Sequence, residues 1–448
     1  MKTKDRRLMK FVGRSAFAVA LIFLSGSAAC RSTERNARQF GESFRIRLGL
    51  EVFLETPARW VGGKRVGLVT NPTGVNADLF SGVTLMIEHS EIDLAVLYGP
   101  EHGIRGDAQA GESVPFFMDD VFDLPVFSLY GPFEKPSTGM LKGIDATMRA
   151  FDTQNTGKIP EKDMVKEIDV MVFDMQDVGT RIYTYISTMA YCMQACADAE
   201  IPFIVLDRPN PINGIDMEGP LLEYPEFSSF VGLYPIPVRH GLTIGELAGL
   251  FNGEFMDGKV DLHVVPMRGW KREMWFDETG LPWVNPSPNM PTLNTAAVYP
   301  GQVFLEGTNI SEGRGTTKPF EFMGAPWIDG NSLCREMNER KLPGAYFRES
   351  WFTPTFSKYK GERCGGGQIH VTDRNRYRSF STTLVLLSTI RRMYPEKMKF
   401  HVRYFDLIMG TPGIREALEG GMDVEKIVQS YQADLDTFAD LRKPYLLY

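Results

Sequence analysis

The stretch Ile92-Asp-Leu-Ala-Val-Leu-Tyr-Gly-Pro-Glu-His-Gly103 passes from an apolar run into a loop of glycines and charged residues. The apolar run predicts a buried strand, and ligands of open α/β sheets bind beyond the carboxyl ends of such strands. Glycines at positions 99, 103, 106 and 111 allow the loop to fold tightly around a ligand. We therefore expect Glu101 at a functional site, with a solvent-facing polar turn as the alternative interpretation.

Four further apolar runs predict strands of the same kind, at residues 64–70, 124–130, 168–174 and 201–207. Helical patterns at residues 79–88 and 183–199 lie between some of them. Strands that alternate with helices are typical of a parallel, doubly wound sheet, so the first half of the chain is predicted to be an α/β domain. A Gly-x-Gly-x-x-Gly motif does not follow the first strand, which disfavours a dinucleotide, and no cofactor is predicted.

The sequence pattern changes beyond Asn213, where proline-rich connectors lead to Gly241. We place a domain boundary there, between a catalytic domain at residues 47–235 and a smaller α+β domain at residues 236–448. Thr243 followed by Glu246 predicts a capping box at the start of a helix. The second domain is expected to contain strands at 262–267 and 367–373, a helix at 381–393, and a polar loop at 304–316 that closes over the cleft of the first domain.

Residues 1–30 have the organisation of a secretory signal. Basic residues precede an uncharged apolar run at residues 16–24, which is too short to span a bilayer comfortably. Small residues then lead to Cys30, in a pattern that resembles a bacterial lipoprotein processing site. This pattern predicts lipidation of Cys30, a polar tether at residues 31–46 and an exported, membrane-anchored protein on the periplasmic side. The alternative is a soluble exported protein cut near Ala29.

The composition is that of a folded protein with a large core, because 43% of the 448 residues are hydrophobic and 23% are charged. The net charge of -7 disfavours binding to nucleic acid. Cys192 and Cys196 lie four residues apart in an apolar helical pattern, where free cysteines act as small core residues. A second close pair of Cys or His residues does not accompany them, so a zinc site is not predicted.

Polar side chains follow the predicted strands, and parallel strands bring their carboxyl ends to one edge of the sheet. We therefore expect a shared cleft at that edge. Aspartates at such positions also cap helices or pair with neighbouring arginines, and for Asp174 and Asp207 the alternative is such a cap or a pair with Arg181 or Arg208. The candidates for the cleft are Asn71, Glu101, Asp174, Asp177, Asp207 and Asn210.

Residues 152–163 imitate the spacing of a calcium-binding EF-hand loop, with Gly157 at the expected offset from Asp152. Gln154 and Thr156 occupy positions where calcium-binding loops usually have acidic residues, so this loop offers few carboxylate ligands for calcium. The sequence leaves open whether this loop binds the ion.

Several short motifs follow one another along the chain: Thr70-Asn-Pro-Thr-Gly74, Gly99-Pro-Glu-His-Gly103 with Arg105-Gly-Asp107, Phe173-Asp-Met-Gln-Asp-Val-Gly179 with Tyr183-Thr-Tyr185, Leu206-Asp-Arg-Pro-Asn-Pro211, Glu218-Gly-Pro220, Arg239-His-Gly241, and Glu306-Gly-Thr-Asn309 with Ser311-Glu-Gly-Arg314. Together they resemble the NamZ-type exo-β-N-acetylmuramidases of bacteria. The resemblance runs from about Gly49 to Tyr448, and the segment at about 145–165 departs from it as an apparent insert.

This resemblance implies a Rossmann-like, doubly wound domain joined to the smaller α+β domain. It also implies a cleft that releases N-acetylmuramic acid from the non-reducing ends of peptidoglycan fragments, with Glu101 as the leading catalytic acid.

The chemistry can also be derived from the residues themselves. Cleavage of a glycosidic bond needs a carboxyl group that protonates the departing oxygen, and usually a second carboxylate that attacks or activates water. Glu101 is predicted to be the first, and Glu112 and Asp177 are predicted for the second role, with Asp107 and Glu312 as alternatives. The acetamido group of the sugar is an alternative nucleophile.

The sugar also carries a lactyl carboxylate, hydroxyl groups and a ring face. An arginine is expected to clamp the carboxylate, asparagines to bind hydroxyl or amide groups, and Tyr183 or Tyr185 to stack on the ring. The predicted substrate-binding residues are Asn71, His102, Arg105, Asp107, Asp174, Arg181, Tyr183, Asp207, Asn210, His240, Asn309, Glu312 and Arg314.

Two other functions compete with this hypothesis. A metal-dependent hydrolase of cell-envelope substrates would use carboxylates and imidazoles at the strand ends, although the sequence has no compact ligand pair and a bound metal is not predicted. A lipoprotein that binds cell-wall sugars without turnover would use the same cleft. The residues available to the metal alternative are His102, Asp107, Asp174, Asp207 and His240.

Overall fold

The computed structural model describes residues 44–109, 111–112, 114–130, 135–136 and 167–448. The predicted signal, Cys30, most of the tether, the EF-hand-like loop and the insert lie outside these residues. In the described part of the chain, no helix is both long enough and apolar enough to cross a membrane.

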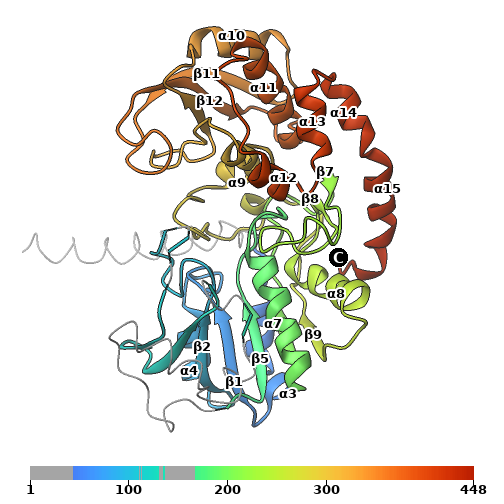
Figure 1. Ribbon diagram of the computed structural model, residues 1–448. Coiled ribbons are helices and arrows are strands. Elements are labelled where there is room, and N and C mark those ends of the chain that lie inside the picture. The colour runs from blue at the N-terminus through green and yellow to red at the C-terminus, as the bar shows by residue number, and fades with distance from the viewer. Residues whose placement is uncertain (1–43, 110, 113, 131–134, 137–166) are drawn as a thin grey trace, which may run out of the picture. The chain divides into compact units, whose positions relative to one another are not determined.

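A parallel sheet forms the centre of the N-terminal half (Figure 1). Its strand order is β3-β4-β2-β1-β5-β6-β9, and every neighbouring pair is parallel except β3 with β4 at one edge. All five strands predicted for the first domain are present in it, which confirms the α/β class. Its strands are β1 (Arg65–Thr70), β2 (Asp93–Gly99), β3 (Phe117–Asp119), β4 (Leu124–Ser128), β5 (Val170–Asp174), β6 (Phe203–Leu206) and β9 (Leu262–Val265).

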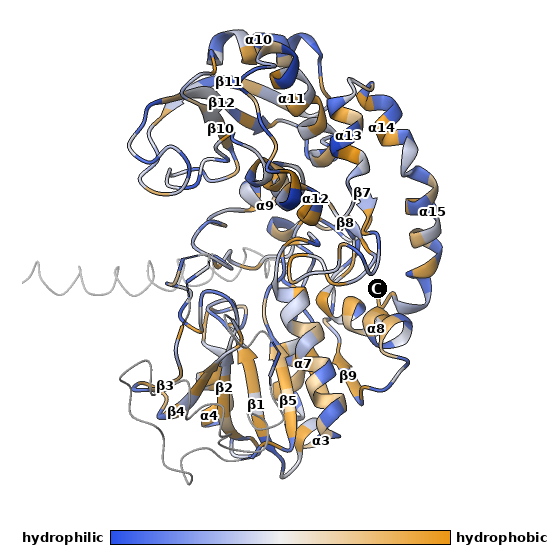
Figure 2. Cartoon of the chain, in the orientation of Figure 1, coloured by the Kyte–Doolittle hydropathy of each residue, from blue (hydrophilic) through white to orange (hydrophobic). Residues whose placement is uncertain are grey.

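Helices cover both faces of this sheet, as the continuous apolar runs of β1, β2 and β5 require (Figure 2). Val69 and Phe173 pack into the same core cluster as the long helix α7, whereas their strand neighbours Leu68 and Val172 pack with α2 and α4. Cys192 and Cys196 are buried in α7, as predicted. The helices of this half are α2 (Gly49–Glu55), α3 (Pro57–Val61), α4 (Gly82–Glu88), α7 (Tyr185–Ala199) and α8 (Ile244–Phe255).

Strand β9 was expected in the second domain, and the structure corrects this expectation. It pairs in parallel with β6, so α8 is a crossover helix between two strands of the large sheet. The predicted capping box begins this helix: Glu246 N donates to Thr243 Oγ1 at 3.2 Å, and Thr243 N donates to Glu246 Oε2 at 3.0 Å. The large sheet therefore continues past the boundary predicted at residue 235.

The C-terminal half is smaller and contains an antiparallel sheet of order β10-β12-β11 with helices packed around it (Figure 1). The last helix, α15, runs back to the first half, and the C-terminus lies beside α8. Between the two sheets lies the hairpin of β7 (Glu218–Leu221) and β8 (Pro237–Arg239) (Figure 1). The helical turn η1 (Phe276–Glu278) follows β9 along the chain. The other elements are α9 (Leu293–Gln302), η2 (Val303–Gly307), β10 (Phe322–Ala325), α10 (Gly330–Glu339), β11 (Ala345–Phe352), β12 (Cys364–Val371), α11 (Ser379–Met393), α12 (Val402–Met409), α13 (Gly413–Glu419), α14 (Val424–Ser430), α15 (Gln432–Leu441) and η3 (Lys443–Tyr445).

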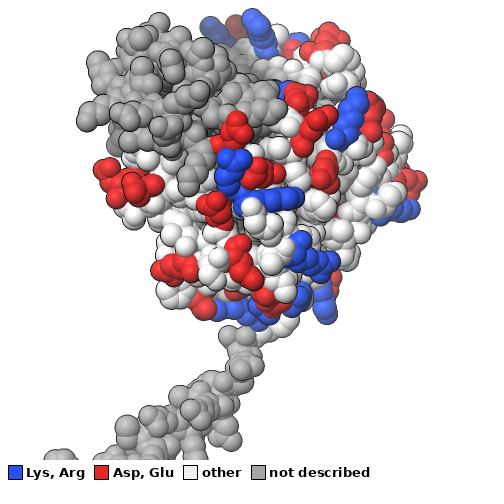
Figure 3. Space-filling model, turned by 90° about the horizontal axis from the view of Figure 1, so that it is seen from below, with Lys and Arg blue, Asp and Glu red and all other residues white. Residues whose placement is uncertain are grey.

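The surface carries both signs of charge. On the face seen in Figure 3, acidic and basic side chains lie interspersed. Some charged side chains form ion pairs, such as Arg65 with Asp169, whose oxygen lies 2.9 Å from Arg65 Nη2. Because the Arg65 guanidinium donates hydrogen bonds to it, the pKa of Asp169 is lowered to about 2.

Candidate active site

A cavity of about 390 Å³ opens beyond the carboxyl end of β2, within the size range of small-ligand sites. Its wall combines two carboxylates, a histidine and an arginine with several aromatic rings among the described residues. Both halves of the chain contribute to it. The lining residues are Glu101, His102, Gly111, Tyr130, Ile182, Tyr183, Thr184, Phe230, Val231, Ser287, Asn289, Met290, Tyr299, Glu306, Arg314, Phe320 and Tyr404.

Glu101 lies two residues after β2 and is partly buried in this wall. The hydroxyl of Thr184 donates to Glu101 Oε2 at 2.8 Å, and the amide of Gly111 donates to Oε1 at 3.4 Å. Thr184 is the residue that precedes helix α7, and its hydroxyl bonds to Glu101 instead of capping the helix. The carboxylate is thus held by groups from two segments and faces the cavity.

His102 is held in a fixed orientation beside Glu101. Its backbone is in the left-handed region, with φ at 74°. Residues other than glycine seldom adopt this conformation, and those that do are found preferentially at functional sites. Its Nδ1 lies 2.8 Å from the carbonyl oxygen of Ala108, and burial lowers its pKa. The neutral ring that results donates through Nδ1 to Ala108 and presents Nε2 as a hydrogen-bond acceptor.

A second charged group lines the cavity from the C-terminal half. Arg314 donates to Glu306 Oε1 from Nε at 3.0 Å and from Nη2 at 2.7 Å, and Tyr404 donates to Glu306 Oε2 at 3.1 Å. The guanidinium also lies 5.1 Å from the ring centre of Phe320. Glu306 and Glu312 raise the pKa of Arg314 against the effect of its burial, so the side chain stays charged. We call Glu306, Arg314 and Tyr404 the charged wall.

A tight turn supplies another part of the lining. Met290 N donates to Ser287 O at 3.0 Å and closes a turn with Pro288 and Asn289 at its centre. The hydroxyl of Tyr185 donates to the carbonyl of the preceding Pro286, and Asn71 Nδ2 donates to the same oxygen at 3.4 Å. Asn71 and Tyr185 therefore lie behind this turn, not in the cavity lining where substrate binding would place them.

Of the predicted site residues, the structure brings Glu101, His102, Tyr183 and Arg314 together in the cavity lining. The remaining ones lie elsewhere, for reasons that differ from residue to residue.

The far part of the Glu101 loop faces solvent. Glu112 is exposed and accepts a hydrogen bond from Gln109 N at 2.8 Å, and Asp107 is also exposed. Arg105 pairs with Asp119 at 2.5 Å and lies over the ring of Phe122. Neither predicted partner carboxylate of this loop reaches the cavity lining.

Two predicted carboxylates at strand ends are buried beside basic side chains of the protein. Arg208 donates to both oxygens of Asp174, at 2.6 and 2.9 Å, which is the pairing that the sequence offered as an alternative. Asp177 Oδ2 lies 3.5 Å from Nε2 of the fully buried His240 and accepts a hydrogen bond from Gly179 N at 2.7 Å. None of these side chains lines the cavity.

Three further candidates form hydrogen bonds between segments of the protein that are distant in sequence. Asn210 donates to Leu242 O at 2.9 Å, and Asn309 donates to Lys397 O at 2.8 Å. Glu312 is buried and accepts a hydrogen bond from Lys358 Nζ at 3.0 Å. These bonds join distant segments, so the three residues stabilise the loops around the site without lining it.

Arg181 was one of three arginines, with Arg105 and Arg314, that were candidates to bind the lactyl carboxylate, but its side chain is completely buried. It donates to the carbonyls of Pro220, Ile236, Ile408 and Met409 at 2.6 to 3.1 Å. Burial lowers the pKa of Arg181 to about 9, so it remains charged at neutral pH. It connects the β7–β8 hairpin to the end of α12.

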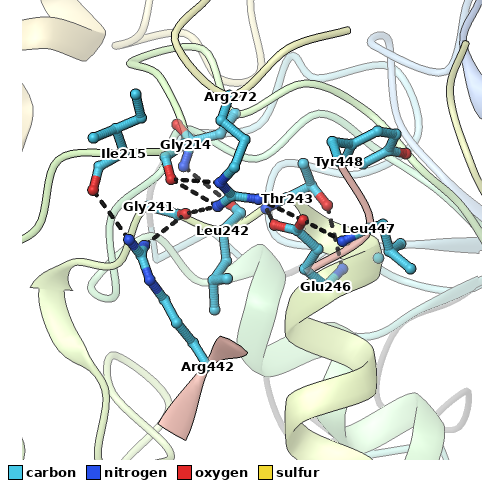
Figure 4. Close-up of polar contacts among 12 residues, drawn as sticks. Gly214, Ile215, Gly241, Leu242, Thr243, Glu246, Arg272, Arg442, Leu447 and Tyr448 are labelled. Carbon is cyan, nitrogen blue, oxygen red and sulfur yellow. Dashed lines mark hydrogen bonds and ion pairs between the residues drawn. The ribbon is translucent and has the colours of Figure 1, made fainter. Parts of the chain in front are cut away.

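Asp207 anchors the C-terminus. It accepts hydrogen bonds from Gly245 N, Thr243 Oγ1 and the hydroxyl of the last residue, Tyr448, at 2.7 to 2.8 Å, and it is fully buried. The neighbouring Leu447 N donates to Glu246 Oε1 at 2.9 Å (Figure 4). Asp207 therefore holds the chain end against α8 and lies outside the cavity lining.

The stability of the protein is expected to depend on Asp207 between pH 4 and 7. Burial raises the pKa of Asp207 to about 7, well above that of an unfolded aspartate. Its contribution to stability is therefore present below pH 4 and is lost as the pH rises through 7. Between pH 4 and 8, the free energy of unfolding of the wild type should fall by up to about 4 kcal/mol more than that of Asp207→Asn. Urea unfolding at each pH measures this difference. Parallel pH profiles for the two proteins would contradict this expectation.

The residues of the metal-hydrolase alternative are not gathered at one place. Among the described residues, no group of three or more His, Cys, Asp or Glu side chains is arranged to hold a metal ion. His102, Asp174, Asp207 and His240 have the separate environments described above, and Asp107 is exposed.

Several lining residues were missed by the sequence analysis, among them Thr184, Ser287, Asn289, Tyr299, Glu306 and Tyr404. Glu306 belongs to a motif within the polar loop at 304–316, and Thr184 lies between two candidate tyrosines, so a local signal was present for both. Tyr404 lies in α12 with no local motif around it, and only the fold brings it to the cavity.

Comparison with known protein families and with known proteins identifies relatives of one and the same family. The family description "Exo-beta-N-acetylmuramidase NamZ, N-terminal" matches residues 66–159 and 148–294, and its C-terminal counterpart matches residues 297–448. The peptidoglycan beta-N-acetylmuramidase NamZ of Bacillus subtilis (strain 168) is 47% identical over 434 residues, which is 97% of this chain and 99% of that protein.

Two solved structures share the fold, both of DUF1343 family proteins from Bacteroides fragilis NCTC 9343. Their TM-scores are 0.79 and 0.68 and their identities 38% and 27%, and each comparison covers 90% of this chain and 99% of the other. The family descriptions meet between residues 294 and 297, after β9.

Proposed function

The chain belongs to the NamZ family of exo-β-N-acetylmuramidases, and we propose that the cavity beside Glu101 is where it releases N-acetylmuramic acid from peptidoglycan fragments, with Glu101 as the general acid. The chain is accordingly a glycosidase that acts on peptidoglycan. The observation that supports the role of Glu101 is its place in the cavity wall at the carboxyl end of β2, with Thr184 and Gly111 fixing its oxygens.

In this proposal Glu101 gives its proton to the glycosidic oxygen as the bond to the anomeric carbon breaks. The sugar displaces water from the carboxyl group when it fills the cavity. The neutral His102 accepts a hydrogen bond from a sugar hydroxyl through Nε2, because Nδ1 is occupied by Ala108. Tyr183 and Tyr299, whose ring centres lie 5.8 Å apart, supply aromatic surface for the ring of the sugar.

The charged wall is proposed to recognise the lactyl carboxylate. Arg314 is the arginine candidate that lines the cavity, since Arg105 and Arg181 are bound elsewhere. Glu306 holds the Nε and Nη2 atoms of Arg314 and fixes the direction of the guanidinium. Glu306 is the second carboxylate of the described lining, and its engagement by Arg314 and Tyr404 gives it this positioning role.

Two attacking groups remain for the anomeric carbon, water and the acetamido oxygen of the sugar itself. Proton NMR of the first product separates them, because direct attack by water inverts the anomeric configuration and acetamido participation retains it.

The experiment that tests the role of Glu101 compares turnover with binding in Glu101→Gln. The variant should bind free N-acetylmuramic acid like the wild type in calorimetry but release almost none from a muropeptide. Equal release by the two proteins would remove Glu101 from the mechanism. Binding of the sugar by a wild type that releases none would favour the alternative of a non-catalytic sugar-binding lipoprotein.

We further propose that the protein is exported and anchored by lipidation of Cys30, with residues 31–46 as a tether. Cells that express the protein should incorporate a palmitate analogue into it, and the Cys30→Ser variant should remain unlabelled and leave the membrane fraction. An unlabelled wild type would instead support a soluble exported protein cut near Ala29.

A further inference from the structure

One part of the cavity lining carries buried polar groups that are not paired within the protein. Residue Asn289 is 6% exposed, and its Nδ2 atom has no hydrogen-bond partner among the described residues. The hydroxyl of Tyr183 likewise has no partner of good geometry in the described part of the chain, although the side chains of Ser287 and Tyr185 lie beside it. We call Tyr183, Ser287 and Asn289 the neutral wall.

Such groups call for an explanation, because an unpaired buried donor has lost its hydrogen bonds to water without replacement. Both donors belong to residues that line the cavity in which the substrate is proposed to bind. A ligand that enters this cavity can supply the missing acceptors. The orphaned donors therefore indicate contact points for a bound molecule.

The neutral wall is also held rigidly, so Asn289 cannot easily turn away to find another partner. Tyr185 and Asn71 donate to the carbonyl of Pro286 on one side of the turn. On the other side, Trp283 Nε1 donates to the carbonyl of Met290 at 3.3 Å. Side chains fixed by their neighbours before the ligand arrives bind it with a smaller loss of entropy.

The two walls differ in charge, and this difference indicates which group of the sugar each wall binds. The carboxylate is attracted to Arg314, whose charge is maintained by Glu306. The neutral wall offers uncharged donors beside the apolar side chains of Ile182 and Met290. An acetamido group fits this combination, because it presents a carbonyl acceptor and a methyl group.

We propose that the neutral wall is the recognition site for the acetamido group, in which Asn289 Nδ2 donates to the acetamido carbonyl and the methyl group packs near Met290. This inference rests on the proposed function, namely that the cavity beside Glu101 holds the sugar. It makes Asn289 a binding residue that selects N-acetylated sugars.

The test measures binding in the Glu101→Gln background by calorimetry, with three sugars as probes. N-acetylmuramic acid carries both groups, muramic acid lacks the acetyl group, and N-acetylglucosamine lacks the lactyl group. Adding Asn289→Ala should weaken binding of the two N-acetylated sugars by about tenfold to a hundredfold and leave that of muramic acid within about threefold. Adding Arg314→Ala should instead weaken binding of the two sugars that carry the lactyl group.

Two controls make the result decisive. Asn331→Ala, at the exposed start of α10, should leave all three affinities unchanged. Asn289→Asp retains the size of the side chain without the Nδ2 donor, so it tests the proposal if Asn289→Ala does not fold. Equal weakening of all three sugars by Asn289→Ala, or none, would overturn the assignment. Failure of the proposed function is seen separately, as unchanged turnover in Glu101→Gln.

Discussion

Replacing Glu101 by glutamine is expected to lower kcat/KM by about 10² to 10⁴ on a muropeptide, whose leaving sugar oxygen needs a proton. Glutamine has nearly the same shape: its oxygen can accept the hydrogen bond of Gly111, and its amide nitrogen can donate to the hydroxyl of Thr184, but it has no acidic proton to give. The effect should be much smaller on a nitrophenyl muramide, because nitrophenolate departs without protonation. The comparison of the two substrates in steady-state assays identifies a general acid.

Glu112→Gln is the matched control for this experiment. It makes the same chemical change eleven residues away in the same loop, at a side chain that is exposed and outside the cavity lining. Its activity should remain within about twofold of the wild type, as is usual for a surface substitution. An equal loss in the two variants would show that the loop is sensitive as a whole, and an equal loss on the two substrates would assign Glu101 a role other than proton donation.

The strands and the loop after β2 could be predicted because their signals are local. A run such as 168–174 is apolar throughout, which only a strand buried on both faces of a parallel sheet explains well. Glu101 follows such a run directly, so its place at the carboxyl edge of the sheet follows from the chain itself. The capping box at Thr243 was predicted from a local pattern of the same kind, and the structure confirms it.

The other strand-end residues show where this reasoning ends. Asp174 and Asp207 are at the predicted edge, but one pairs with Arg208 and the other receives Tyr448 from the far end of the chain. Side chains at the same edge can point into a cleft or toward a neighbouring loop, and hydrogen-bond partners distant in sequence decide between them. Strand β9 was assigned to the wrong half for a related reason, since its pairing with β6 has no local signal.

The charged and neutral walls could not be predicted, because each is assembled from separate segments. Glu306 and Arg314 flank a loop, but Tyr404 reaches them from α12. Asn289 stands in an irregular turn whose position depends on Asn71 and Tyr185 from the N-terminal half. Sites that are assembled from distant segments in this way can be identified only from the folded structure.

Replacing Arg181 by alanine is expected to destabilise the protein by about 3–5 kcal/mol, because it leaves buried carbonyl groups without donors and a cavity where the side chain was. Its guanidinium satisfies four carbonyls among the described residues, and two of them end helix α12. A cation at this place also interacts favourably with the helix dipole. Without it, buried carbonyl groups of α12 and of the β7–β8 hairpin lose their donors. Chemical unfolding and the shift in Tm measure the effect.

Two further variants separate this structural role from the carboxylate-binding role that the sequence suggested for Arg181. Arg181→Met fills most of the volume but offers no donor, so it should also be destabilised, because the four carbonyls remain unpaired. Arg105→Ala, at a more exposed arginine, should cost much less. At a temperature where Arg181→Met is still folded, its affinity for N-acetylmuramic acid should equal that of the wild type. A stable variant that has lost this affinity would return Arg181 to the substrate and place the lactyl group away from Arg314.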